Sequence, residues 1–292
     1  MRTPSPTGSF EEIEKYATKT ASASLIANLF STVHVGPDGL PRGTSNTPEE
    51  KRAAHAAQYA SIAVQTQGRL LAEILGRIAT KFGVPDEREL AVFLTMDGRV
   101  DGKLAAALAR AYRHFWNEDY EACVYVIVPK IEAAARALLR QLDEGIYRVA
   151  AEHELGGYPG LYVLLDELKK LDLDPSWAFY LNWLLIDFRG ANLRNSVAHG
   201  FVEEVGPEYA ALVLRAAALL IDLVGPRPHD QADYERDTGL TVNERRDRTT
   251  VLQRLAHPIA DPLPPPRRSV GSVVRGTLAL AAQHWPFQRR SP

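Results

Sequence analysis

Cysteine is almost absent from this chain, in which Cys123 is the only one among 292 residues. A single cysteine excludes an intrachain disulfide framework and a cluster of thiolate metal ligands. Long apolar runs are also absent, since the most apolar segment, 209–224, is interrupted by Arg215 and Asp222 and is too short to span a membrane. The N-terminal residues contain no apolar stretch that resembles a signal peptide. We therefore expect a cytoplasmic protein with no membrane partner.

An excess of charge of one sign is absent as well. The chain has 34 basic and 36 acidic residues and a formal net charge of −2, so no global positive field draws it to nucleic acid. Any contact with RNA must come from a local basic site. Hydrophobic residues make up 46% of the chain and charged residues 24%, which is the balance of a soluble globular protein with a sizeable core.

The spacing of apolar residues is helical almost throughout and predicts an all-α fold. Residues 10–32 and 208–224 carry apolar side chains at helical spacing. Between the first of these helices and the next, residues 34–46 are dense in glycine and proline and predict a loop. No convincing strand pattern occurs apart from short stretches near Tyr147 and Phe201.

The strongest helix start lies at Thr47. This residue is suited to the N-cap, Pro48 to the first turn, and Glu50 to a capping box with Thr47. The helix is expected to run to about Phe82, with a break or a bend near Gly68.

Two further helix starts follow in the second half of the chain. Residues 115–142 carry one apolar stripe, with Asn117 as the expected cap and Pro129 as the expected position of a kink or a fresh start. Asp174 is suited to cap the next helix, because Pro175 follows it at the first helical position.

The most informative motif is the heptapeptide RNSVAHG, residues 194–200. Arg194 provides a planar guanidinium, the side chain best suited to hold phosphate. His199 provides an imidazole, which moves protons near neutral pH. Asn195 places an amide directly after the arginine. The combination points to phosphodiester chemistry without a metal or other cofactor.

The Arg–His spacing alone does not carry this interpretation. Arg148 and His153 have the same separation, but they lack the adjacent amide and the following glycine. A structural alternative is a capping network, in which Arg194 binds carboxylates and His199 bonds to carbonyls at a helix end. Ser196 fits a cap or a packing role better than that of a nucleophile, because no acid–base triad can be identified around it.

Residues Phe115 to Val224 resemble a known domain, the uncharacterised domain defined by the RNxxxHG signature. That domain also occurs in the ER-membrane-associated RNA degradation protein and is similar to the HEPN (higher eukaryotes and prokaryotes nucleotide-binding) superfamily. The last of the three segments that carry the resemblance is the most specific, since Gly190, Asn192 and Leu193 also fit the pattern. The segments are DYEACVYVIVPKIEAAARALL, GLYVLLDEL and GANLRNSVAHG.

The resemblance implies a compact helical bundle that pairs with a second copy about a two-fold axis. Many HEPN domains are metal-independent endoribonucleases in toxin–antitoxin, antiphage and RNA-surveillance systems. On this basis Arg194 and His199 would be catalytic, with Asn195 as their polar partner. RNA is then the expected substrate, a homodimer the expected assembly, and an antitoxin or regulatory protein a possible further partner. The alternative is a non-catalytic HEPN-like module that binds RNA, nucleotide or protein and mediates dimerisation.

The motif imposes one geometric constraint. Five residues along a helix rotate by about 140°, so Arg194 and His199 do not stack on one face. A dimer accommodates this arrangement more easily than a monomer does. One role open to Glu132 is to support the arginine, but we expect it on a solvated face. His55, His153 and His229 show no metal-ligand spacing, and we expect them to be structural or exposed.

The chain divides into three regions in this interpretation. Residues 1–110 form a helical N-terminal region, and residues 111–225 form the HEPN-like RNxxxHG domain. Residues 226–292 are expected to be a Pro-rich linker and mobile tail, with one short helix over 270–285. Residues 1–9 are rich in Pro, Ser, Thr and Gly and are expected to be disordered.

Overall fold

A computed structural model describes most of the first three quarters of the chain. The segments 224–292 and most of 143–156 lie outside the described residues, and so do the predicted linker, tail and helix over 270–285. The described residues are 4–23, 29–36, 39–95, 100–142, 144, 147, 157–202 and 204–223.

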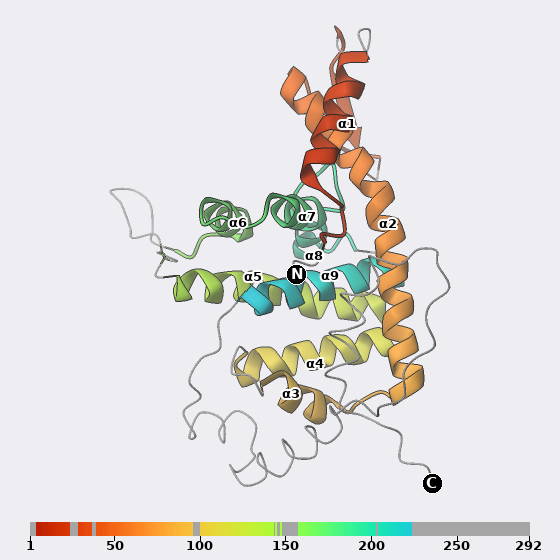
Figure 1. The fold of residues 1–292 in the computed structure, drawn as a ribbon, viewed down its shortest axis with the longest axis vertical. Helices are drawn as coiled ribbons and strands as arrows, with labels where there is room; N and C mark the ends of the chain where they lie inside the picture. Colours follow the sequence, from red (N-terminus) through yellow and green to blue (C-terminus); the bar gives the residue numbers. More distant parts are fainter. Residues whose placement is uncertain are drawn as a thin grey trace, which may run out of the picture.

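The described chain is mostly helical, as the apolar spacing predicted (Figure 1). None of the helices within these segments combines the length and the apolar character needed to cross a membrane. The helices are α1 (Phe10–Ala23), α2 (Pro48–Phe82), α3 (Glu87–Thr95), α4 (Gly102–Trp116), α5 (Tyr120–Gln141), α6 (Leu161–Lys170), α7 (Pro175–Leu185), α8 (Leu193–His199) and α9 (Pro207–Leu223).

The described chain is not wholly helical, because an antiparallel hairpin lies where the sequence predicted a loop. Strands β1 (Thr32–Val35) and β2 (Pro41–Ser45) pair there. The glycines and prolines that predicted a loop instead close a turn, in which the N–H of Gly39 donates to the carbonyl of Gly36 over 3.0 Å. The β-branched residues of Thr32-Val33-His34-Val35 favour a strand. Helix α1 ends at Ala23, whereas the predicted helix extended to residue 32.

Helix α2 begins as predicted. The Thr47 hydroxyl accepts a hydrogen bond from the N–H of Glu50 at 3.2 Å, and the Glu50 carboxylate accepts one from the N–H of Thr47 at 3.0 Å. The helix continues through Gly68 without the break that we considered there. A Cβ on Gly68 would lie 2.9 Å from the Cβ of Glu208 and 3.0 Å from its carbonyl oxygen. Gly68 therefore allows α2 and α9 to approach closely.

The boundary between α4 and α5 differs from the prediction. Asn117 is the C-cap of α4 rather than the cap of the following helix. Asp119 caps α5, where its carboxylate accepts a hydrogen bond from the N–H of Ala122 at 3.2 Å. Helix α5 then continues through Pro129, so no fresh start occurs at that residue.

The N-terminal segment is ordered against α7 in the described residues, contrary to the expectation for residues 1–9. Ser5 and Thr7 are buried. The Ser5 hydroxyl donates to the carbonyl of Ser176 at 3.0 Å, and the Ser176 hydroxyl accepts from the N–H of Phe10 at 3.1 Å. Helix α7 begins as predicted, with Asp174 as its cap and Pro175 in its first turn. The first turn of α7 therefore also anchors the N-terminal segment, through Ser176.

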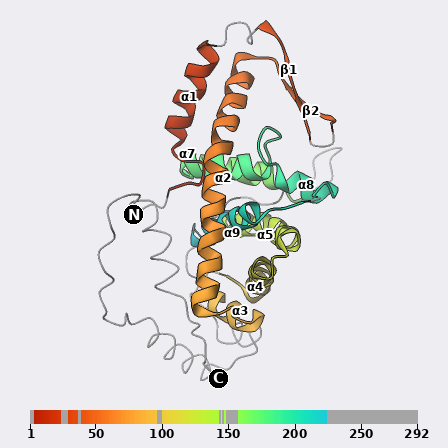
Figure 2. The ribbon, with the colours of Figure 1, turned by 90° about the vertical axis from the view of Figure 1, so that its right-hand side faces the viewer.

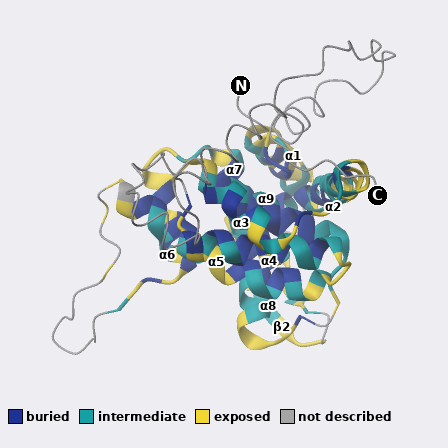
Figure 3. Ribbon diagram, turned by 90° about the horizontal axis from the view of Figure 1, so that it is seen from below, coloured by how far each residue is buried: buried dark blue, intermediate teal, exposed yellow. Residues whose placement is uncertain are grey.

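One hydrophobic core joins the described helices from Ile13 in α1 to Leu220 in α9. Helix α2 runs along one side of the molecule, and α4, α5 and α9 cross it (Figures 1 and 2). Helix α1 and the hairpin lie on opposite sides of the N-terminal half of α2 (Figure 2). Buried residues gather where α5, α9 and α4 meet (Figure 3). The boundary predicted between residues 110 and 111 falls within α4, and residues on both sides of it share this core.

Candidate functional site

The short helix α8 carries the whole RNxxxHG motif. It begins after Asn192, a 9% exposed residue whose φ of 50° is in the left-handed region. It ends before Gly200, which is a left-handed C-cap with a φ of 70° and a ψ of 25°. The N–H of Phe201 donates to the carbonyl of Ser196 at 2.8 Å and closes this terminus. Backbone geometry therefore fixes both ends of the helix, and with them the positions of Arg194 and His199.

Arg194 lies against α5, where Glu132 holds it. The Nη2 atom of Arg194 is 3.7 Å from Oε2 of Glu132, and the Arg194 side chain keeps 36% of its surface exposed. The other carboxylate oxygen of Glu132 accepts a hydrogen bond from Nη2 of Arg136 at 2.8 Å. The expectation that Glu132 faces solvent is wrong, because only 22% of its side chain is exposed and it lies between two arginines.

This cluster keeps a net positive charge, since two guanidinium groups share one carboxylate. Arg136 also lies over the ring of Tyr158, with 5.4 Å between its central carbon and the ring centroid. Its Nε atom is buried and has no hydrogen-bond partner in the part of the chain that the structure describes. Arg136 is therefore held by packing and by Glu132, and it supports the position of Arg194 through that shared carboxylate.

Asn195 links the arginine to the start of α8. Its side-chain oxygen accepts a hydrogen bond from Nη1 of Arg194 at 3.3 Å, and its amide nitrogen donates to the side-chain oxygen of Asn192 at 2.7 Å. The predicted adjacency of guanidinium and amide is therefore a direct contact. In the described structure Asn195 orients Arg194, and it does not cap the N-terminus of α8.

His199 lies at the opposite end of α8 and faces solvent. Its ring centroid is 5.8 Å from that of Phe201. Within the described residues no hydrogen bond joins the imidazole to Arg194 or Asn195. The structure thus brings Arg194 and Asn195 together and leaves His199 apart from them, in keeping with the different helical faces that their spacing implies.

Exposed aromatic side chains lie directly after the motif and on either side of Gly160, and sequence reasoning did not identify them. Tyr158 is 64% exposed, Tyr162 is 66% exposed and Phe201 is 61% exposed. The segment before α6 lies over the arginine, because a Cβ on Gly160 would be 3.9 Å from Nη2 of Arg194. The sequence signal for this feature is GGYPGLY, which places two tyrosines on either side of that glycine.

Within the described segments, no three His, Cys, Asp or Glu side chains lie close enough together to hold a metal ion. No protein-family model, curated protein or solved structure in the comparisons matches the chain. The interpretation of the site therefore depends on its own residues and geometry.

Proposed function

We propose that this protein is an endoribonuclease that cleaves RNA without a metal, with Arg194 binding the scissile phosphate and His199 transferring protons. One observation carries the proposal. Glu132 and Asn195 fix the guanidinium of Arg194 while leaving 36% of the side chain exposed, on the same short helix as the exposed His199. A pre-oriented, accessible cation and a solvent-facing imidazole, at the two ends of one short helix, are the groups that phosphodiester cleavage requires.

The proposed reaction uses the 2′-hydroxyl of the RNA as its nucleophile. A bond forms between the 2′-oxygen and phosphorus, and the bond between phosphorus and the 5′-oxygen breaks. An imidazole removes the 2′-hydroxyl proton, and a proton is delivered to the leaving 5′-oxygen. Arg194 stabilises the charge that develops on the phosphoryl oxygens. The products are a 2′,3′-cyclic phosphate and a free 5′-hydroxyl.

A homodimer would supply a second imidazole for this chemistry. Proton removal and proton delivery occur on opposite sides of the phosphorus, whereas each chain presents one His199, at the exposed end of α8. Two copies of α8 facing each other would place one His199 on each side, with two Arg194 side chains at the phosphate. This arrangement also makes use of the different helical faces of the two residues.

The aromatic surroundings favour single-stranded RNA as the substrate. Exposed Tyr158, Tyr162 and Phe201 offer ring faces on which unpaired bases can stack. Arg136 and Arg194 supply positive charge beside those rings, although the whole chain has a net charge of −2. We propose antiphage defence, a toxin–antitoxin pair or RNA turnover as the setting, which is what the HEPN resemblance implies.

A second candidate function is a non-catalytic module that binds RNA, nucleotide or a protein partner. Two features favour it. Glu132 neutralises part of the charge of Arg194, and no hydrogen bond within the described residues orients the ring of His199. Both functions need the same anion contact at Arg194, so turnover is the property that separates them.

The experiment is RNA cleavage in the presence of EDTA by the purified full chain. Wild type is compared with Arg194→Ala, His199→Ala and Glu132→Gln on a single-stranded RNA and on DNA of the same sequence. We expect cleavage of RNA only, because DNA lacks the 2′-hydroxyl. We expect cyclic phosphate ends, a loss of about 100-fold or more for His199→Ala and Arg194→Ala, and a smaller loss for Glu132→Gln.

The matched control is His153→Ala, which removes the histidine of the second Arg–His pair with the same spacing. This variant should cleave like wild type. Binding of RNA by wild type without any turnover would replace the nuclease proposal with the binding module. Equal cleavage by wild type and His199→Ala would show that the activity does not come from this site.

A further inference from the structure

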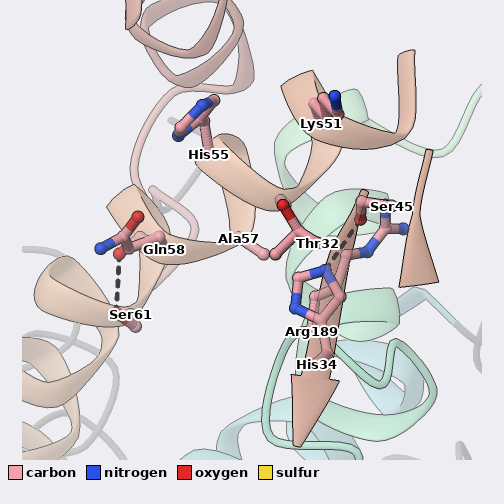
Figure 4. A pocket seen from close by; sticks show the side chains of 10 residues that line it. Thr32, His34, Ser45, Lys51, His55, Ala57, Gln58, Ser61 and Arg189 are labelled. Carbon is pink, nitrogen blue, oxygen red and sulfur yellow. Dashed lines mark hydrogen bonds between the residues drawn. The ribbon is translucent and has the colours of Figure 1, made fainter. Parts of the chain in front are cut away.

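A cavity lies between the hairpin and the first turns of α2 (Figure 4). Its volume is about 420 Å³, within the range of about 300–1,000 Å³ that small-molecule sites occupy. The walls come from three parts of the chain: the hairpin, one face of α2, and the segment between α7 and α8. Polar and charged side chains in these walls include those of His34, Ser45, Lys51, His55, Gln58 and Arg189.

Helix α2 contributes one face of this cavity. Lys51, His55 and Gln58 follow one another at spacings of four and three residues, so their side chains share a side of the helix. Lys51 is only 6% exposed, which is unusual for a lysine. Ala54 and Ala57 lie between these polar groups and give the same wall an apolar part. His55 is thus a lining residue, next to a buried cation.

Arg189 forms the wall between α7 and α8 and is held rigidly. Its Nε and Nη2 atoms bind the two carboxylate oxygens of Asp187 at 2.8 and 2.9 Å. Its Nη1 atom donates to the carbonyl of Glu50 at 3.4 Å, which ties this segment to the first turn of α2. A guanidinium fixed in this way is already oriented before any ligand arrives.

The hairpin closes the cavity and is itself fixed in place. His34 and Ser45 form a hydrogen bond of 2.8 Å between Nε2 and Oγ, across the two strands (Figure 4). The ring of His34 meets that of Phe188 edge-on, with the centroids 5.4 Å apart. A Cβ on Gly43 would lie 2.6 Å from the Phe188 ring, so the strand contacts that ring closely. Ser45 is 0% exposed. Its hydrogen bond to His34 therefore links the two strands, and its hydroxyl is not accessible as a nucleophile.

The composition of the lining defines the ligand class. The described residues that line the cavity include an arginine, a lysine and two histidines, with hydroxyl and amide groups, and no carboxylate. The carboxylates of Asp187 and Glu50, which are not lining residues, offset the charge of Arg189, and Lys51 adds a positive charge to the lining. The volume exceeds that of a free phosphate ion, and the alanines offer contact to a carbon skeleton. We propose that this cavity binds a small organic phosphate, with its phosphate toward Lys51 and Arg189.

This site is independent of the proposed ribonuclease activity. Its walls are the hairpin, α2 and the segment between α7 and α8, and they include none of Arg194, Asn195 and His199, whereas Arg194 lies against α5. The two sites can therefore be observed separately through their histidines, since His34 and His55 line the cavity and His199 belongs to α8.

The test is a titration of the full chain with ribose 5-phosphate, followed by NMR of the imidazole signals. The signals are assigned with His34→Gln, His55→Gln and His199→Gln. We expect saturable shifts of His34 and His55 with ribose 5-phosphate and none with uncharged ribose. The absence of any shift would overturn the proposal, and so would a shift confined to His199, because the anion would then bind only at α8.

Two charge variants on the same helix sharpen the test. Gln58→Glu places a carboxylate in the cavity wall without changing side-chain size, and Gln58 is exposed, so the fold is preserved. Gln65→Glu makes the same change at an exposed position of α2 outside the cavity. We expect Gln58→Glu to weaken binding about tenfold or more and Gln65→Glu to change it less than about twofold. Equal affinities in the two variants would overturn the assignment.

Discussion

At the scale of single residues, burial decides what a charged side chain does. Glu73–Arg77 in α2 and Glu132–Arg136 in α5 are both Glu–Arg pairs four residues apart on a helix. The first pair is 57% and 79% exposed and contributes at most about 1 kcal/mol. The second is 22% and 24% exposed, and its carboxylate also holds Arg194. Both pairs have the same residue types at the same spacing. Packing alone therefore distinguishes the surface ion pair from the pair in the candidate site.

Cys123 illustrates the same effect on a titrating group. It is buried in α5, and burial raises the pKa of its thiol from 9.0 to about 12. Because the thiolate is the reactive form, we expect the native protein not to react with a thiol-specific reagent at pH 8. Unfolding in guanidinium should expose one reactive thiol per chain, since Cys123 is the only cysteine. Rapid labelling of the folded protein would contradict this prediction.

The raised pKa also sets a pH window for stability. A group whose folded pKa lies above its unfolded value stabilises the fold fully below the unfolded pKa. For Cys123 that contribution should disappear as the pH rises from about 9 to about 12. Burial raises the pKa of Tyr112 from 10.0 to about 12, so it acts in the same direction. The free energy of unfolding should therefore fall across this range, with a shallower slope in Cys123→Ala.

At the scale of elements, local signals define the helix ends well. The capping box at Thr47, the Asp174-Pro175 start of α7 and the left-handed Gly200 all follow from residues within one turn of one another. The hairpin was missed because its turn residues also suit a loop. Its strands are only four and five residues long. Pairing and contact with Phe188 stabilise it, and neither is visible in such short segments.

Two glycines in α2 provide a matched test of element packing. A Cβ on Gly68 would meet Glu208 of α9 at 2.9 Å, whereas a Cβ on Gly76 would meet nothing within 4 Å. Gly76→Ala should stabilise the protein by about 0.5–1 kcal/mol through helix propensity. Gly68→Ala should destabilise it by about 1–3 kcal/mol, because α2 and α9 must move apart. Denaturant unfolding of both variants measures the change in the free energy of unfolding. Stabilisation by both substitutions would show that α2 and α9 can move apart at little cost.

At the scale of the whole molecule, the described helices share one core. Helix α9 packs between α2 and α5, and the cluster extends from Ile13 to Leu220. A fragment of residues 111–225 would expose the face of α9 that contacts Gly68 and its neighbours in α2. The described helices of this segment therefore depend on α2 for their packing.

This dependence predicts cooperative unfolding. In the full chain, the transitions seen by circular dichroism and by tryptophan fluorescence should coincide, because Trp116, Trp177 and Trp183 contact the same core. The isolated 111–225 fragment should show little fixed tertiary structure by near-ultraviolet circular dichroism. A fragment that folds with native-like signals, or two separate transitions in the full chain, would show that the regions are independent.

The sequence by itself determined the helical character of the chain, several helix ends and the motif of Arg194, Asn195 and His199. These features depend on residues that are neighbours along the chain, where capping and periodicity act. The tertiary structure alone decided that Glu132 holds Arg194, that Gly68 is a point of helix contact, and that Lys51 and Arg189 line one cavity. Each of these contacts joins residues that are distant in sequence. Capping motifs and hydrophobic periodicity act between near neighbours, so they do not indicate which distant surfaces pack together.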